Sequence, residues 1–252
     1  MNKYAICTLV TNFKQYNHMK KSFLNSGFGS KCDYFYIDNS NSNIYDGYSG
    51  INYFIKNIEA KYLIICHQDV ELNFDNREKL DKIIADMDKI DPLWGVLGNA
   101  GGDDNMSKLY LNLNDPYKSQ KIICFPKKVL SLDENFLVIN NKYNISCSHD
   151  LAGFHFYGTD LCLQALFKGC NSYVVDFYLT HYGKGTINKE FYDAKNRFIH
   201  KYSQILHNKY LRTTCAKLYF SNNYLKLKFF NSTFIMKIKT FIDIVRGFLN
   251  DK

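Results

Sequence analysis

The stretch at residues 60–71 constrains the fold most, because an unbroken apolar run ends there abruptly in polar side chains. Residues 62–66 read Tyr-Leu-Ile-Ile-Cys, and His67, Gln68 and Asp69 follow directly. Such a run predicts a central strand buried on both faces of a parallel sheet. Open α/β sheets bind ligands at the carboxyl ends of their strands, so Asp69 is a candidate for holding a metal ion or a phosphorylated ligand. The alternative is an aspartate that caps the following helix.

The rest of the amino-terminal region repeats this strand–helix alternation. Strands are predicted at residues 4–10, 34–37 and 62–66, and apolar residues recur at helical spacing in residues 16–24 and 50–58. Strands joined by helices imply right-handed crossovers and a parallel sheet. We therefore predict an α/β fold with a mostly parallel central sheet flanked by helices.

The remaining elements are predicted from the same signals. Residues 98–104 read Gly-Asn-Ala-Gly-Gly-Asp-Asp and predict a flexible loop, and residues 178–186 predict another loop that contains glycine. Helices are predicted at residues 75–90, 158–169 and 187–206, and strands at residues 94–97, 121–125, 129–132, 136–139 and 172–175.

The carboxyl-terminal residues differ in character from the rest. After residue 217, basic side chains alternate with Phe, Ile and Leu, which predicts a helix lying on an anionic membrane surface. The alternative is a helix that packs on the domain or on a second subunit. We predict that the α/β domain comprises residues 1–210 and that a basic aromatic tail comprises residues 211–252. The basic residues of the tail include Lys226, Lys228, Lys237, Lys239 and Arg246.

Composition narrows the partners and the compartment. The chain of 252 residues has a net charge of +8, but its lysines are scattered through the first two hundred residues. This favours phosphorylated ligands and anionic membranes over nucleic acid as partners. The eight cysteines form no C-x-x-C pair, which favours reduced, buried thiols. With no signal peptide and no transmembrane run recognised, we expect a cytoplasmic protein, and the tail would suit the inner face of the plasma membrane.

Four polar clusters follow strands that a parallel sheet would align. They begin at Thr11, Asp38, His67 and Gly98. A nucleotide site needs an acceptor for base or ribose and a divalent cation near the phosphates. Asp38 suits the first role and Asp69 the second, whereas loop solvation alone would also explain Asp38.

A second group of candidates lies later in the chain. Asp160 falls in the first turn of a predicted helix beside aromatic residues, an environment that suits a general base for a sugar hydroxyl. His181 lies in a glycine-containing loop and is a candidate cation ligand, and Lys184 is placed to offset phosphate charge. The alternatives are that Asp160 caps its helix and that His181 is an ordinary surface residue.

Taken in order, these motifs resemble a GT-A glycosyltransferase of the family-2-like group. The resemblance runs from about residue 3 to residue 186. Its most specific part is Tyr-Gly-Thr-Asp-Leu-Cys-Leu-Gln-Ala at residues 157–165, with Leu-Asp-Glu before it at 132–134. One departure concerns the D-x-D metal motif, which reads His67-Gln68-Asp69 here and leaves fewer carboxylates for the cation.

The resemblance implies a hexosyltransferase-like enzyme that uses a nucleotide-sugar donor and Mn²⁺ or Mg²⁺, and that inverts the anomeric carbon. The acceptor would be a glycan or a lipid-linked glycan in surface polysaccharide or lipopolysaccharide synthesis. Asp160 would be the catalytic base, and Asp69 and His181 the metal ligands. The donor would contact Thr11, Asn12, Asp38, Asn39, Gln68, Asp69 and Lys184, and the acceptor side would comprise Asp133, Glu134, His155 and Tyr157.

Two other functions fit parts of the pattern. A protein of the same fold that binds nucleotides or glycans without catalysis is consistent with His67 in the metal motif. A nucleotidyltransferase would share the parallel sheet and the metal-bound nucleotide. However, it would carry a glycine-rich basic loop after the first strand, where this chain has Thr11, Asn12, Phe13 and Lys14.

Overall fold

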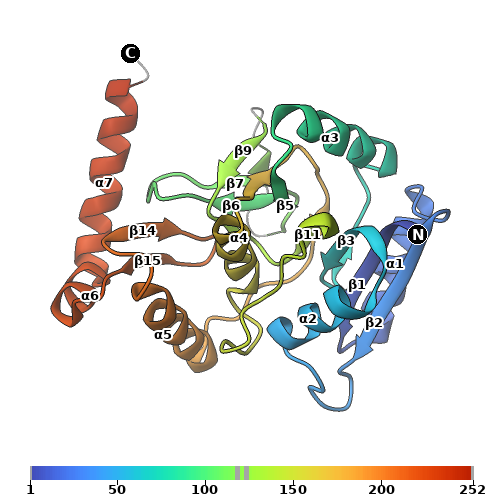
Figure 1. Cartoon of the computed structure of the whole chain (residues 1–252), viewed down its shortest axis with the longest axis horizontal. Helices are drawn as coiled ribbons and strands as arrows, with labels where there is room; N and C mark the ends of the chain where they lie inside the picture. Colours follow the sequence, from blue (N-terminus) through green and yellow to red (C-terminus); the bar gives the residue numbers. More distant parts are fainter. Residues whose placement is uncertain (1, 117–119, 122–124, 251–252) are drawn as a thin grey trace.

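A seven-stranded sheet forms the centre of the molecule (Figure 1). The structure is a computed structural model that describes residues 2–116, 120–121 and 125–250. The strand order is β2-β1-β3-β11-β5-β12-β9. Five strands run in one direction, and β11 and β9 run antiparallel to their neighbours, so the prediction of a mostly parallel sheet is confirmed. The strands are β1 (Asn2–Val10), β2 (Cys32–Asp38), β3 (Ala60–Cys66), β5 (Trp94–Gly98), β9 (Lys127–Val129), β11 (Phe136–Asn140) and β12 (Asn171–Val174).

The strand β3 explains why the apolar run at its centre is unbroken. Leu63 and Ile65 point into one hydrophobic core, while Tyr62 and Ile64 point into another on the opposite face of the sheet. Successive side chains of a strand alternate between faces, and here both faces are covered. The burial of β3 therefore requires helices on both sides of the sheet.

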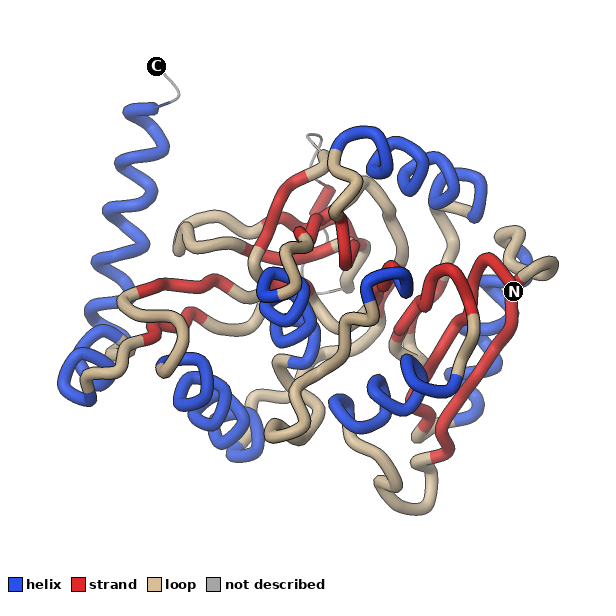
Figure 2. The backbone as a smooth tube through the Cα atoms, viewed as in Figure 1, coloured by secondary structure: helices blue, strands red, loops and turns tan. Residues whose placement is uncertain are grey.

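Helices cover both faces of the sheet (Figure 2). The first core takes in apolar side chains of α2, α4 and α5, and the second takes in those of α1 and α3. Asn76, not Asp69, caps α3 through its side chain, so the helix-capping alternative for Asp69 was wrong. The helices are α1 (Phe13–Asn25), α2 (Gly47–Asn57), α3 (Arg77–Ile90), α4 (Tyr157–Phe167) and α5 (Lys189–Ser203), with a short 3-10 turn at Asn141–Tyr143.

Small sheets beside the central one correct several predicted elements. The predicted flexible loop at residues 98–104 contains the buried strand β6 (Ala100–Gly102), which pairs with β7 (Tyr110–Leu113) and β10 (Ser131–Leu132). A Cβ on Gly101 would lie 2.2 Å from the Ser131 carbonyl oxygen, so the glycine reflects close backbone packing and not mobility. The predicted strand at residues 129–132 is split between β9 and β10.

Two further points concern the predicted elements near these sheets. Of the predicted strand at residues 121–125, positions 122–124 lie outside the described residues, and β8 comprises Gln120–Lys121. The predicted loop at residues 178–186 contains β13 (Thr180–His181), which pairs antiparallel with β4 (Val70–Glu71). This pairing joins the segment after β3 to a segment more than a hundred residues later.

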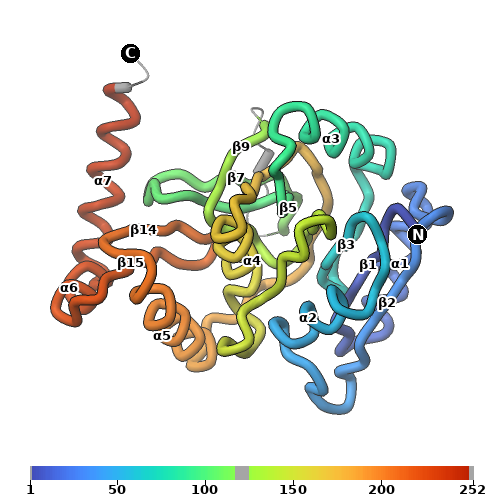
Figure 3. The backbone as a smooth tube through the Cα atoms, in the orientation of Figure 1, coloured from blue at the N-terminus to red at the C-terminus, as the bar shows by residue number. Residues whose placement is uncertain are grey.

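The carboxyl-terminal part begins with a hairpin of β14 (Lys209–Arg212) and β15 (Lys217–Phe220). Leu211, Leu218 and Phe220 belong to the larger core, and the predicted boundary at residue 210 falls inside β14. Two helices follow, α6 (Tyr224–Phe230) and α7 (Thr233–Asn250), at the far side of the molecule from the amino-terminal strands (Figure 3). Among the described residues, no helix combines the length and apolarity needed to cross a membrane.

The cysteines with described positions are free thiols, as predicted, but they are not all buried. Cys7, Cys66, Cys147, Cys162 and Cys170 are buried, Cys32 is half-buried, and Cys215 is exposed. Cys124 lies outside the described residues.

Candidate metal centre and active site

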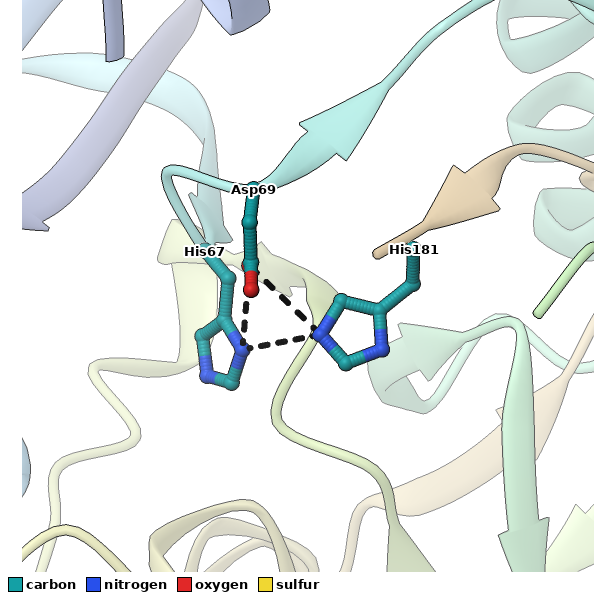
Figure 4. A group of neighbouring side chains, drawn as sticks. All are labelled: His67, Asp69 and His181. Carbon is teal, nitrogen blue, oxygen red and sulfur yellow. Dashed lines mark hydrogen bonds and ion pairs between the residues drawn. The ribbon is translucent and has the colours of Figure 1, made fainter. Parts of the chain in front are cut away.

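Three side chains converge where β3 ends. His67 and Asp69 follow β3, and the pairing of β4 with β13 brings His181 beside them (Figure 4). Nδ1 of His67 lies 3.5 Å from Nε2 of His181, and Oδ1 of Asp69 lies 3.9 and 3.5 Å from these two atoms. A point equidistant from the three atoms is about 2.1 Å from each, which is the distance expected for imidazole and carboxylate ligands of a divalent cation. The three residues therefore fit a metal ion.

The surroundings of this triad also fit a bound cation. A Cβ on Gly183 would lie 2.6 Å from Oδ2 of Asp69 and 2.8 Å from Nε2 of His181, so only glycine leaves this space open. The other ring nitrogen of His67 is 2.8 Å from the Tyr157 hydroxyl. Such a contact fixes the orientation of a ligating imidazole.

Electrostatics within the triad favour an ionised carboxylate. Burial acts to raise the pKa of Asp69, but the hydrogen bond from His181 and the electrostatic interaction with the two imidazoles outweigh it and hold the pKa below its usual value. Burial and the neighbouring His181 lower the pKa of His67, which favours its neutral form. Burial acts to lower the pKa of His181, but its hydrogen bond with Asp69 and the charges of Asp69 and Asp133 raise it above the usual value. A metal binds a carboxylate and neutral imidazoles, so it would displace a proton from His181.

A cleft of about 710 Å³ opens beside the triad. Its wall includes His67 and His181 together with groups from distant segments of the chain. Of the residues predicted from the sequence, Asp133, Glu134, His155 and Lys184 also line it. A cleft of this volume is within the range of small-molecule binding sites.

Two adjacent carboxylates in the cleft wall differ in their environments. Asp133 accepts hydrogen bonds from the Thr214 hydroxyl at 2.6 Å and from the backbone and amide groups of Asn135. Burial opposes ionisation of Asp133, but these bonds and the charge of His181 hold its pKa below the usual value. Burial and the charge of Asp133 raise the pKa of Glu134 to about 8. Paired acids whose pKa values are driven apart are typical of sites for proton transfer.

The edge of the sheet beside the triad carries the residues predicted to bind the donor. Oε1 of Gln68 accepts from the backbone N–H groups of Thr11 and Asn12, and its amide donates to the Thr11 hydroxyl at 2.7 Å. Gln68 therefore ties the start of α1 to the triad. Asn12 caps α1 through its side chain.

The neighbouring loop after β2 presents Asp38 to solvent. Hydrogen bonds from the backbone and hydroxyl of Ser40 lower the pKa of Asp38. Asn39 is buried, and its amide bonds the backbone of Ile44 and Tyr45. Asn39 thus shapes the loop, and Asp38 is the exposed acceptor on it.

Asp160 lies apart from the cleft. Its side chain is fully buried and accepts hydrogen bonds from the backbone and hydroxyl of Ser148, each at 2.7 Å, and from the Tyr202 hydroxyl. Burial raises the pKa of Asp160, and these bonds partly offset the effect. The bonds join α4 to α5 and to the segment before α4. The side chain does not cap α4, contrary to the alternative considered from the sequence.

Comparisons with known proteins identify one relative by sequence. The chain is 32% identical over 206 residues to the ATP synthase subunits region ORF 6 protein of Fuscovulum blasticum, covering 79% of this chain and 83% of the relative. The chain belongs to the family of this ORF 6 protein. No family model matches the chain.

Among solved structures, the ORF 6 family member resembles a mannosyltransferase. The mannosyltransferase PcManGT of Pyrobaculum calidifontis, solved with GDP-mannose and Mn²⁺, superposes with a TM-score of 0.51 at 7% identity. The match covers 81% of this chain and 62% of the mannosyltransferase, so the chain spans less than two thirds of that enzyme. Residues 1–349 of TarS of S. aureus give a TM-score of 0.44 at 11% identity, over 71% of this chain and 60% of that one. At these identities the likeness to PcManGT supports the α/β fold predicted for the ORF 6 family member.

The sequence did not single out several residues of the cleft. Arg212 reaches the cleft from the end of β14, and Thr214 and Cys215 reach it from the turn between β14 and β15, in a region interpreted as the start of the tail. Asp115 and Thr186 also line it. No spacing motif marks these residues, because the contacts depend on how distant strands of the ORF 6 family member pack.

Proposed function

We propose that the protein is a glycosyltransferase that moves a sugar from a nucleotide-sugar donor to a glycan or a lipid-linked acceptor, in the synthesis of a surface polysaccharide or lipopolysaccharide. The observation that carries the proposal is the convergence of His67, Asp69 and His181 at the carboxyl edge of the sheet, beside a cleft with a pair of carboxylates. The fold shared with a mannosyltransferase solved with GDP-mannose and Mn²⁺ supports it.

The donor would lie along the edge formed by the ends of β1, β2 and β3. Asp38 is the exposed acceptor for the nucleoside, and Thr11 and Asn12 border the same edge. The diphosphate would reach the triad, where Lys184 in the cleft wall adds positive charge. A divalent cation held by His67, Asp69 and His181 would stabilise the negative charge of the departing nucleoside diphosphate.

We assign the role of catalytic base to Glu134. Its carboxylate lines the cleft and accepts a hydrogen bond from the backbone N–H of Gly158 at 3.3 Å, in the first turn of α4. The acceptor hydroxyl oxygen forms the new bond to the anomeric carbon as the bond from that carbon to the phosphate oxygen breaks. Glu134 takes the hydroxyl proton, and the nucleoside diphosphate leaves with the electron pair, so a single displacement inverts the anomeric carbon.

The pKa of Glu134 sets the pH at which it can act as a base. A value of about 8 leaves the group largely protonated at neutral pH without metal, so turnover should rise with pH as Glu134 ionises. Asp160, the base expected from the resemblance, has its carboxylate enclosed by Ser148 and Tyr202. The geometry favours Glu134 for the proton transfer and Asp160 for holding α4 and α5 together.

A nucleotide panel tests the proposal in two steps. Thermal shifts with nucleoside diphosphates, with and without Mn²⁺, report donor binding, because a ligand that binds the folded protein stabilises it by RT ln(1 + c/Kd), where c is the free ligand concentration. Release of nucleoside diphosphate from a panel of nucleotide sugars then reports turnover. We expect Glu134→Gln to lower turnover by at least ~100-fold while the nucleotide-induced shift persists.

The outcomes separate the candidate functions. Metal-dependent nucleotide binding without release from any nucleotide sugar would favour a non-catalytic binding protein of the same fold. Near-normal turnover by Glu134→Gln would refute the assignment of the base. Loss of turnover in Asp160→Asn with an unchanged melting temperature would return that role to Asp160.

A further inference from the structure

The last helix, α7, is attached to the rest of the molecule along one side. Met236 and Asp243 are buried on that side, where Met236 packs with Met106 and Tyr219. The Asp243 carboxylate accepts the backbone N–H of Met106 at 2.9 Å and pairs with Lys239. These contacts fix the rotation of α7 about its own axis.

The opposite side of α7 is apolar and exposed. Its three phenylalanines, Phe234, Phe241 and Phe248, are between 66% and 71% exposed. With Ile238 and Val245 they follow one another at intervals of four and three residues, so they form a single stripe along the helix. An amphipathic helix usually turns such a stripe toward the core, whereas the exposure of these side chains shows that α7 turns it toward solvent.

The charges around the apolar stripe have one sign. Lys237 and Arg246 are exposed on α7, and Lys226 and Lys228 are exposed on α6 beside Tyr224, Leu225 and Phe229. Asp243 is the one acidic residue between residues 224 and 250, and it is buried and paired. The outer surface of α6 and α7 therefore combines apolar side chains with uncompensated positive charge.

This surface fits a lipid bilayer better than a second copy of the chain. Ile242 and Leu249 widen the stripe to roughly 120° of the helix circumference at 100° per residue, beyond the seam of a two-helix coiled coil. Between residues 224 and 250 a second copy would offer Lys237 and Arg246 no exposed acidic partner, so charge does not favour pairing of two copies. Anionic headgroups offer the opposite charge, and the acyl region accepts the phenylalanines.

We propose that α6 and α7 dock the protein on an anionic lipid surface, with α7 lying in the plane of the interface. The hairpin of β14 and β15 links this surface to the cleft. Thr214, in the turn of the hairpin, donates a hydrogen bond to Asp133 in the cleft wall, and β15 leads into α6. The cleft is thereby held at a set distance from the lipid. A lipid-linked acceptor would reach the cleft from the bilayer. This role of the docking surface rests on the proposed function.

Vesicle binding of the full chain tests the docking surface. The probe is phosphatidylcholine vesicles with or without phosphatidylglycerol, at low and high salt, measured by flotation. Binding should require phosphatidylglycerol and weaken as salt rises. The double variant Phe241→Ser/Phe248→Ser should lower the partition coefficient at least ~10-fold, because two buried aromatic side chains are lost. Lys237→Gln and Arg246→Gln should each lower it roughly fivefold.

Matched controls separate docking from folding and from general stickiness. Ile90→Ser/Leu93→Ser removes two apolar side chains that are 58% and 52% exposed near the end of α3, and it should bind like the wild type. All variants should keep their melting temperature, since each changes an exposed side chain.

Two results would overturn the proposal. One is vesicle binding that Phe241→Ser/Phe248→Ser leaves unchanged. The other is a concentration-dependent dimer, seen by sedimentation, that this variant abolishes while no chain binds vesicles. The assay contains no nucleotide sugar, so its outcome is independent of glycosyl transfer.

Discussion

The Tyr157 hydroxyl lies 2.8 Å from Nε2 of His67, on the side of the imidazole away from Asp69 and His181. The first helical residue of α4 thus holds a side chain of the candidate metal centre, although the two are 90 positions apart in the chain. This contact sets the direction in which Nδ1 of His67 points.

Removing this hydroxyl should weaken metal binding. We expect Tyr157→Phe to raise the dissociation constant for Mn²⁺ about 10–100-fold in isothermal titration, because His67 loses its orienting partner. The control is Tyr48→Phe, which loses a hydrogen bond from a buried tyrosine to the His155 carbonyl and leaves His67 untouched. Equal Mn²⁺ affinities in the two variants would contradict an orienting role.

The donor set predicts metal selectivity. Two imidazole nitrogens and one carboxylate suit Mn²⁺, Co²⁺ and Zn²⁺ better than Mg²⁺, which prefers oxygen ligands. In titrations, the dissociation constant for Mn²⁺ should be at least ~10-fold lower than that for Mg²⁺. The variant His67→Asp should bring the two dissociation constants closer together, because it replaces a nitrogen ligand with an oxygen ligand. A wild-type protein that binds Mg²⁺ as tightly as Mn²⁺ would argue against ligation by both histidines.

The space beside the triad should tolerate no side chain at residue 183. Gly183→Ala would place a methyl group 2.6 Å from Asp69 and 2.8 Å from His181, so both ligands must shift. We expect at least a ~10-fold loss of Mn²⁺ affinity. Gly29→Ala is the control away from the triad, since its Cβ would meet only the Leu24 side chain at 3.9 Å, an ordinary van der Waals contact. If both variants bind Mn²⁺ like the wild type, the cation does not occupy the triad.

The raised pKa of Glu134 predicts a pH-dependent stability without metal. Its folded-state pKa is about 8, above the ordinary value of 4.5, so the native protein keeps a proton that the unfolded chain releases. Stability from this group is present below pH 4.5 and is lost as the pH rises to about 8. Glu134→Gln should therefore gain stability relative to wild type over this range, reaching about 1–4 kcal/mol at pH 9 in denaturant titrations. A constant difference from pH 4 to 9 would show that Glu134 titrates normally.

Asp160 should prove important for stability. Asp160→Asn replaces a carboxylate that accepts bonds from Ser148 and Tyr202 with an amide that has one acceptor oxygen. We expect a loss of roughly 2–4 kcal/mol, or a melting temperature lower by about 5–15 °C. Tyr202→Phe, which removes one donor and keeps the ring, should show a smaller decrease. An unchanged melting temperature in Asp160→Asn would exclude this role.

Local pattern sufficed to predict the central sheet. The apolar run of β3 is continuous because both faces of that strand are buried, and helical spacing located α1, α2 and α3. The same pattern located Asp69 at a strand end. These features depend on residues close together in the chain, so periodicity records them.

Tertiary structure decided which of the polar residues meet. His67 and His181 are 114 positions apart, and only the pairing of β4 with β13 brings them together. Glu134 and Asp160 are both acids near α4, yet packing places one in the cleft and encloses the other. Likewise, the composition of α7 predicts an amphipathic helix, but its burial at Met236 and Asp243 decides that the apolar side faces outward. Contacts between distant segments leave no periodic trace in the sequence, because they arise only when the sheet and its helices pack.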